Sequence, residues 1–144
     1  MGVDTEAKVP YDTVLIKDGK VVPQYYVNTT EIGLYLNILV EVEKAGNADA
    51  LVRIAEVLDT LEKAPTWNGL FFWPYDIVKG ELKPTAEGIV PAVDNGNLAF
   101  ALAGVAGAYL TSEAQPNKPL FRALMRCWKD KKPVGQNCTM KVVA

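Results

Sequence analysis

The sequence predicts an all-α protein that forms part of an (α/α) toroid of alternating inner and outer helices, preceded by a short N-terminal β-hairpin or extended arm. Apolar residues recur at helical spacing in four segments. The first and third segments are apolar around most of their circumference, as inner helices are, whereas the second and fourth have one apolar face. This alternation favours a toroid over a four-helix bundle, in which each helix would show one apolar stripe.

Length and composition fit one domain covering residues 1–144, with 49% hydrophobic and 22% charged residues. The formal net charge is −2, from 15 basic and 17 acidic residues, so we expect no nucleic-acid partner. The longest apolar run, residues 98–110, is shorter than the roughly 20 residues of a membrane helix, so we expect no membrane span.

Residues 1–27 are predicted to form the arm or hairpin. Two β-prone runs within residues 13–27 flank Asp18-Gly19, a pair that favours a tight turn. Pro23 limits the second run to an edge strand or an extended arm.

The first helix should begin at Asn28 or Thr29, because Asn28 and Glu31 have the spacing of a capping box, and it should end at Gly46. It carries two apolar stripes: Ile32, Leu36 and Leu39, and Leu34, Ile38 and Val42. We therefore expect an interior helix.

The second helix should cover residues 47–63 and end before Pro65, with one apolar face formed by Leu51, Ile54, Ala55, Leu58 and Leu61. The third should start at Asp94-Asn95 and run to about Leu110. The fourth should open with Pro119 and expose its polar side, with Leu120, Leu124 and Trp128 at helical spacing. The toroid segment then spans residues 28–130, and residues 131–144 form a tail.

Histidine is absent, which excludes the common Cys/His zinc sites and the Ser/His and Cys/His nucleophiles. We expect neither a metal nor a cofactor. Cys127 and Cys138 are a candidate disulfide, which would place the protein in the periplasm or outside the cell. The alternative is two reduced thiols and a cytoplasmic location.

Residues 64–94 join the second helix to the third and form the predicted functional loop. Connections of this length are uncommon in compact domains unless they are functional or disordered. Five aromatic residues argue against disorder: Trp67, Phe71, Phe72, Trp73 and Tyr75.

Four ordered motifs carry a resemblance: TEIGLYL at residues 30–36, LDTLEK at 58–63 leading to WNG at 67–69, WPYD at 73–76, and VDNGNLA at 93–99. Together they resemble the glucoamylase-like toroid domain of cyclic β-1,2-glucan synthases and related β-1,2-glucanases. The resemblance covers residues 28 to about 110.

The resemblance implies a toroid whose inner-helix ends and loops hold an oligo- or polysaccharide, a β-glucan, for hydrolysis or transglycosylation. The family's ring is several times longer, so we expect this chain to supply part of one, completed by a homo-oligomer or a partner chain. The general acid is not placed on any residue. The alternative function is a non-catalytic carbohydrate-binding or assembly module.

The candidate catalytic residues are Asp76 and Asp94, because glycoside chemistry uses a pair of carboxyl groups. The alternative for Asp94 is a helix N-cap. The candidate substrate-binding residues are Glu31, Trp67, Asn68, Trp73, Tyr75, Asn95 and Asn97. Capping is the alternative for Glu31, capping and turn formation for Asn95 and Asn97, and core packing for the aromatics.

Overall fold

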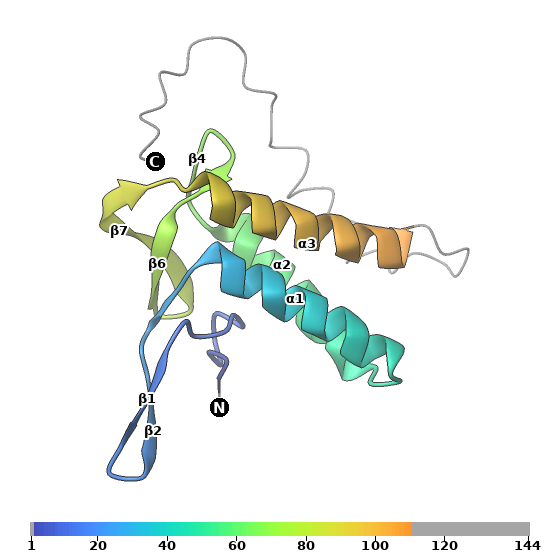
Figure 1. The fold of residues 1–144 in the computed structure, drawn as a ribbon, viewed down its shortest axis with the longest axis horizontal. Helices are drawn as coiled ribbons and strands as arrows, with labels where there is room; N and C mark the ends of the chain where they lie inside the picture. Colours follow the sequence, from blue (N-terminus) through green and yellow to red (C-terminus); the bar gives the residue numbers. More distant parts are fainter. Residues whose placement is uncertain (1, 111–144) are drawn as a thin grey trace.

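The computed structural model describes residues 2–110, which form three helices and seven strands (Figure 1). The helices are α1 (Thr29–Lys44), α2 (Asp49–Lys63) and α3 (Ala92–Leu110). The strands are β1 (Val14–Lys17), β2 (Lys20–Pro23), β3 (Tyr26–Val27), β4 (Thr66–Trp67), β5 (Leu70–Phe71), β6 (Trp73–Val78) and β7 (Glu81–Ile89).

The predicted all-α class is wrong, because 46% of the described residues are helical and 27% lie in strands. The strands that overturn it come mainly from residues 64–94, which were expected to be a loop. Two tight turns fold this segment into hairpins, at Asn68-Gly69 and at Lys79-Gly80. All four turn residues have positive φ, which a type I′ hairpin turn requires.

The main sheet has the antiparallel strand order β3-β6-β7. Val27 pairs with Tyr75, and Ile77 pairs with Leu82, and all four side chains are buried. The alternation of strand side chains therefore places one face of the sheet against the core. β3 reaches the sheet from before α1, so the sheet fixes the start of that helix.

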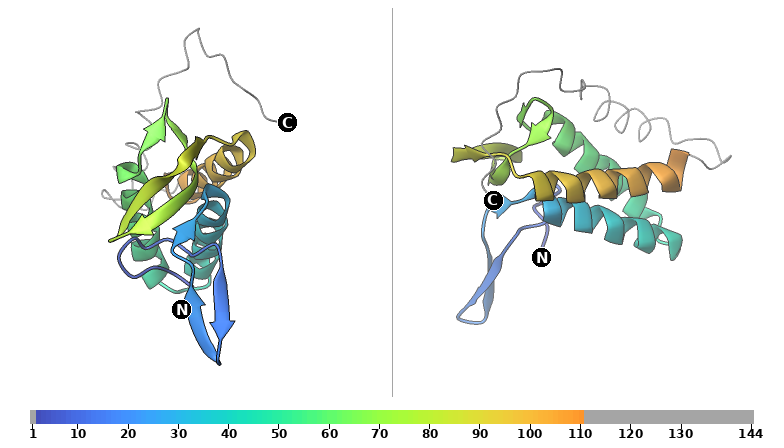
Figure 2. Two further views of the ribbon diagram at one scale, coloured as in Figure 1. Left: turned by 90° about the vertical axis from the view of Figure 1, so that its left-hand side faces the viewer. Right: turned by 45° about the horizontal axis from the view of Figure 1, so that its top comes forward.

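The predicted N-terminal hairpin is confirmed. β1 pairs antiparallel with β2, and the turn residues Asp18 and Gly19 have φ values of 51° and 71°. Figures 1 and 2 show this hairpin projecting from the rest of the molecule. Its apolar side chains gain little burial, since Ile16 is 78% exposed.

Helices α1 and α3 lie side by side and run in the same direction (Figures 1 and 2). Thr30 contacts Asp94 near the start of both helices, and Glu43 contacts Tyr109 near their ends. A Cβ atom added at Gly33 would lie 3.3 Å from the Cα of Leu98, so glycine allows this close approach. α2 packs on the other side of α1 and shares the core, whose largest fully buried side chains include Ile32, Leu36, Ile54, Leu58, Leu61 and Leu98.

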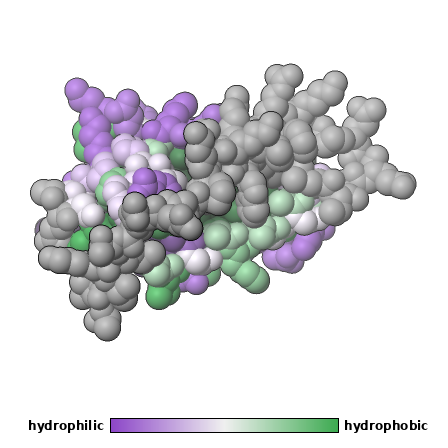
Figure 3. Space-filling view, turned by 90° about the horizontal axis from the view of Figure 1, so that it is seen from above, coloured by the Kyte–Doolittle hydropathy of each residue, from purple (hydrophilic) through white to green (hydrophobic). Residues whose placement is uncertain are grey.

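The interior positions predicted for α1 and α3 are only partly correct. Each helix buries one face, while Leu34, Ile38 and Phe100 are 57%, 58% and 77% exposed. Apolar surface is also visible over the helical part of the molecule in the view from above (Figure 3). Within residues 2–110, the exposed apolar faces of α1 and α3 are therefore not covered by another element.

The starts of α1 and α3 differ from the prediction. Asn28 precedes α1 but makes no side-chain cap hydrogen bond, so the expected capping box does not form. α3 starts at Ala92, two residues earlier than expected. The predicted fourth helix and both cysteines, Cys127 and Cys138, lie outside the described residues.

Packing at Gly33 generates a stability prediction. Gly33→Val should lower the free energy of unfolding by about 1–3 kcal/mol, because its branched side chain has to enter a contact that is already tight. Gly96→Ala in α3 is the matched control. A Cβ there meets no atom within 4 Å, so it should stabilise the protein by about 0.5–1 kcal/mol. Urea denaturation with unchanged m-values checks both, and equal stability of the two variants would contradict this packing.

Candidate functional site

Polar side chains gather where α1 and α3 begin, because parallel neighbouring helices bring their N-termini together. This N-terminal cluster consists of Asp12, Asn28, Thr30, Glu31, Asp94 and Asn97. Free backbone N–H groups and aligned dipoles make helix N-termini favourable places for negative charge. The fold thus gathers carboxyl groups at two positive helix ends.

Thr30 links the two helices through hydrogen bonds. Its hydroxyl donates to Oδ1 of Asp94 at 2.7 Å and accepts from Nδ2 of Asn97 at 3.1 Å. Asp94 lies in the first turn of α3 and is not the N-cap that was considered as its alternative role. The structure therefore unites three residues of the resemblance motifs, from positions more than 60 apart in sequence.

Asp12 belongs to the cluster and was missed by sequence reasoning. Its Oδ1 accepts a hydrogen bond from Nδ2 of Asn28 at 2.8 Å, and its Oδ2 accepts one from Thr13. The residue precedes β1, and no local periodicity connects it with the start of α1. The β1–β2 hairpin and the hydrogen bond from the Asp12 N–H to the Tyr26 carbonyl bring the two segments together.

Three buried side-chain oxygen atoms at the start of α1 have no hydrogen-bond partner among the described residues: Asn28 Oδ1, Thr29 Oγ1 and Glu31 Oε2. The Thr29 side chain is fully buried. Buried polar atoms are normally hydrogen-bonded, and an unmet one costs about 1–3 kcal/mol.

The pKa of the Glu31 carboxyl group is raised above its ordinary value of 4.5, chiefly because burial disfavours the charged form. Its own backbone N–H opposes this shift, and the negative charges of Asp12 and Asp94 add to it. Glu31 therefore keeps its proton to higher pH than an exposed glutamate. Its role as a cap, the alternative from sequence, accounts for neither its burial nor its unpartnered oxygen.

Asp76, the second candidate catalytic residue, lies on β6 with an exposed side chain. It stands between Tyr26 of β3 and Lys83 of β7 in the sheet register. Within residues 2–110, no hydrogen bond or ion pair joins Asp76 to Asp94. The catalytic role expected for Asp76 stays a prediction.

The aromatic candidates separate into two groups. Trp67 and Trp73 are 41% and 38% exposed, so their rings are accessible from solvent. Tyr75 is fully buried, and its hydroxyl donates to the Pro65 carbonyl at 2.6 Å and accepts from the Phe72 N–H at 2.9 Å. Burial raises its pKa to about 12. Tyr75 is thus a core residue, because an enclosed ring offers no face to a sugar.

The candidate amides also differ. Asn95 Oδ1 accepts from the Phe71 N–H, and its Nδ2 donates to the carbonyls of Phe71 and Pro91, all within 2.9 Å. Both ends of this amide are occupied in fixing β5 to α3, which is a structural role. Asn97 is exposed in the cluster, and Asn68 forms the β4–β5 turn with a φ of 50°.

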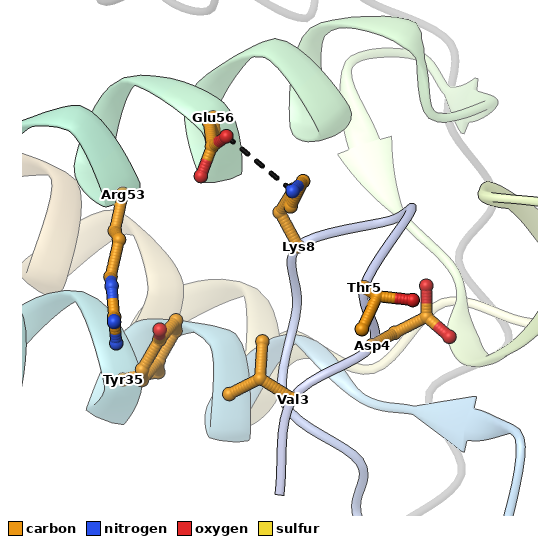
Figure 4. Close-up of a pocket in the computed structure, with 7 residues that line it drawn as sticks. All are labelled: Val3, Asp4, Thr5, Lys8, Tyr35, Arg53 and Glu56. Carbon is orange, nitrogen blue, oxygen red and sulfur yellow. Dashed lines mark ion pairs between the residues drawn. The ribbon is translucent and has the colours of Figure 1, made fainter. Parts of the chain in front are cut away.

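A cavity of about 260 Å³ lies away from these residues, between the N-terminal segment and helices α1 and α2 (Figure 4). Its lining residues are Val3, Asp4, Thr5, Lys8, Tyr35, Arg53 and Glu56, none of which was a predicted site residue. In the described part of the chain, no group of three or more Cys, Asp and Glu side chains could hold a metal ion. No helix there is long and apolar enough to cross a membrane.

Glu31→Gln tests the electrostatics of the cluster. Because the pKa of Glu31 is raised on folding, the native state binds the proton more tightly, and stability falls as pH rises from the unfolded to the folded pKa. Glu31→Gln has no carboxyl group at this position and therefore does not lose this stability as pH rises. Its Tm should be higher than that of wild type at pH 7 and the same below pH 4. Thermal unfolding across this range measures the difference. Asp59→Asn, at an exposed position on α2, should show no such pH-dependent gain, and a lower Tm of Glu31→Gln at pH 7 would contradict the assignment.

Of the comparisons with known proteins, the comparison of structures gave a match. No family model matches the chain, and no curated protein matches it. A crystal structure of a protein from Bacteroides caccae, described provisionally as a glucoamylase, matches with a TM-score of 0.70 and 20% sequence identity. The match covers 90% of this chain and 32% of that chain, so this chain spans about a third of the length of the neighbour. The fold is therefore similar to part of a glucoamylase-like structure.

Proposed function

We propose that this chain is a carbohydrate-active domain that binds a β-glucan at the N-terminal cluster and cleaves or transfers its glycosidic bonds with carboxyl groups. One observation carries the proposal. Glu31 and Asp94 lie in the first turns of adjacent parallel helices but in different environments. The similarity to the glucoamylase-like structure supports a carbohydrate as the ligand.

Glycoside chemistry requires one carboxyl group that holds a proton and a second one that is ionised. Burial favours the protonated form of Glu31, which suits donation to the leaving oxygen. Asp94 accepts a hydrogen bond from Thr30, which orients its carboxyl group. In this proposal Glu31 acts as the acid, and Asp94 activates water or attacks the sugar. Asp76 is the competing candidate for the role of Asp94.

Sugar recognition needs polar partners for hydroxyl groups and a flat apolar surface for the ring. Thr30 and the exposed Asn97 supply a hydroxyl and an amide group beside the acids. Trp67 and Trp73 offer exposed aromatic faces, on which sugar C–H groups can stack. We infer a β-1,2 linkage from the resemblance of the motifs at residues 30–36 and 93–99.

Reducing ends released from linear β-1,2-glucan measure the proposed activity. Glu31→Gln and Asp94→Asn should each lower the rate at least 100-fold, since a positioned acid or base contributes about 10²- to 10⁴-fold. Glucan binding should persist in both variants. The control Asp59→Asn should keep the wild-type rate. If Asp76→Asn abolishes turnover while Asp94→Asn does not, the assignment of Asp94 is wrong, and a protein that neither binds nor cleaves the glucan contradicts the proposed function.

A second candidate function is assembly, and the exposed apolar face of α1 and α3 favours it. Leu34, Ile38 and Phe100 lie more than half exposed on these two helices. Contiguous exposed apolar surface is typical of protein interfaces. A second copy of this chain, or a further helical chain, would cover the face without involving the acids.

Sedimentation velocity over a range of concentrations tests assembly. We expect association of the wild-type chain, weakened at least tenfold in Phe100→Ser because this side chain would lose a large buried area. Ile16→Ser removes a similarly exposed apolar side chain from the β1–β2 hairpin and should not change association. A wild-type monomer at all concentrations excludes self-assembly.

A further inference from the structure

We propose that the cavity between the N-terminal segment and helices α1 and α2 binds a small oxyanion, a carboxylate or phosphate group, with Arg53 as its principal contact. This site is separate from the proposed glucan site and does not depend on it. Four ionisable side chains line the cavity: Asp4, Lys8, Arg53 and Glu56. Their pairing determines which charge faces a ligand.

Asp4 is occupied within its own turn. Its Oδ1 accepts hydrogen bonds from the backbone N–H groups of Glu6 and Ala7, and its Oδ2 accepts one from the Tyr11 hydroxyl at 2.9 Å. The side chain is buried, and Figure 4 shows it at the opposite end of the lining from Arg53. Asp4 therefore shapes the cavity wall and has little capacity left for a cationic ligand.

Lys8 and Glu56 form an ion pair at 3.5 Å, with their side chains 40% and 39% exposed. Pairs of this kind are weak, since solvent screens them and two flexible side chains have to be held in place. Arg53 makes no ion pair within residues 2–110, and its exposed side chain lies at the same end of the lining as Tyr35 (Figure 4). Among the described residues, the cavity thus has one cation without a partner and a second that is loosely held.

The wall that carries Lys8 is fixed before any ligand binds. Lys8 has a φ of 61°, a left-handed conformation that is uncommon for a residue with a side chain. The Lys8 N–H donates to the Asp4 carbonyl, and the Asp4 N–H donates to the Val9 carbonyl. Thr60 of α2 donates to the carbonyl of the fully buried Ala7. A rigid wall lowers the conformational entropy that binding would otherwise cost.

The shape and chemistry of the cavity indicate the ligand class. Guanidinium groups bind carboxylate and phosphate oxygens through two parallel hydrogen bonds. The hydroxyl groups of Thr5 and Tyr35 provide further donors on the lining. The volume of about 260 Å³ is slightly below the roughly 300–1,000 Å³ of sites for drug-sized molecules, so the ligand should be small.

Calorimetric titration of the full chain with acetate and with inorganic phosphate, at constant ionic strength, tests this site. Arg53→Gln should weaken binding at least tenfold. Glu56→Gln should tighten it severalfold, because it removes the acid that competes for Lys8. Lys63→Gln, which removes an exposed cation from the end of the same helix, should leave the affinity unchanged.

The site is supported if either anion binds wild type more tightly than Arg53→Gln and less tightly than Glu56→Gln. The anion that binds more tightly identifies the ligand class. Equal affinity in Arg53→Gln and wild type overturns the proposal, as do weaker binding in Glu56→Gln and the absence of binding by both anions. Thermal unfolding of Arg53→Gln separates loss of the site from loss of the fold. If Arg53→Gln unfolds at a lower temperature than wild type, Arg53→Lys replaces it in the test. Lysine keeps the charge but cannot form two parallel hydrogen bonds, so this variant should also bind the anion more weakly than wild type.

Discussion

The close contact between α1 and α3 at Gly33 determines where the polar groups of this protein lie. Without a side chain at this position, the two helices approach until the Cα of Leu98 is within van der Waals reach. Hydrogen bonds from Thr30 to Asp94 and from Tyr109 to Glu43 join the two parallel helices at both ends, and their N-termini lie together. Thr30, one turn before Gly33, then reaches Asp94 across the interface. The helix packing therefore positions the acids.

The cluster that results is electrostatically unusual, because it combines attraction and repulsion. Two helix N-termini favour negative charge there, while Asp12, Glu31 and Asp94 repel one another. Burial raises the pKa of Glu31 and so favours its neutral form. Differences in environment, rather than in residue type, thus make Glu31 a weaker acid than an exposed glutamate.

Local sequence patterns were sufficient for the elements that depend on local interactions. Apolar spacing located α1, α2 and α3, and Asp18-Gly19 located the first hairpin. β4 and β5 were missed because each strand has only two residues, on either side of the Asn68-Gly69 turn. β6 was missed because it pairs with β3, which is distant in sequence. Asn-Gly is itself a hairpin pattern and could have identified the β4–β5 turn.

The candidate site could be predicted only in part, because some of its residues are placed by contacts between distant parts of the sequence. The motifs pointed to Glu31, Asp94 and Asn97, which the fold brings together. Asp12 and one wall of the cavity come from the N-terminal segment, whose place depends on long-range contacts such as that between Thr60 and Ala7. The roles of Tyr75 and Asn95 depended on burial and hydrogen-bond geometry, which composition does not encode.

One turn of α1 performs two tasks, since Thr30 and Glu31 belong to the cluster and Gly33 to the helix contact. A residue inserted or deleted within this turn would rotate the side chains by about 100° relative to the glycine. The acids would then point away from α3, or the glycine would leave the interface. Length changes in this stretch should therefore be tolerated far less than substitutions, whereas the projecting β1–β2 hairpin can accept both.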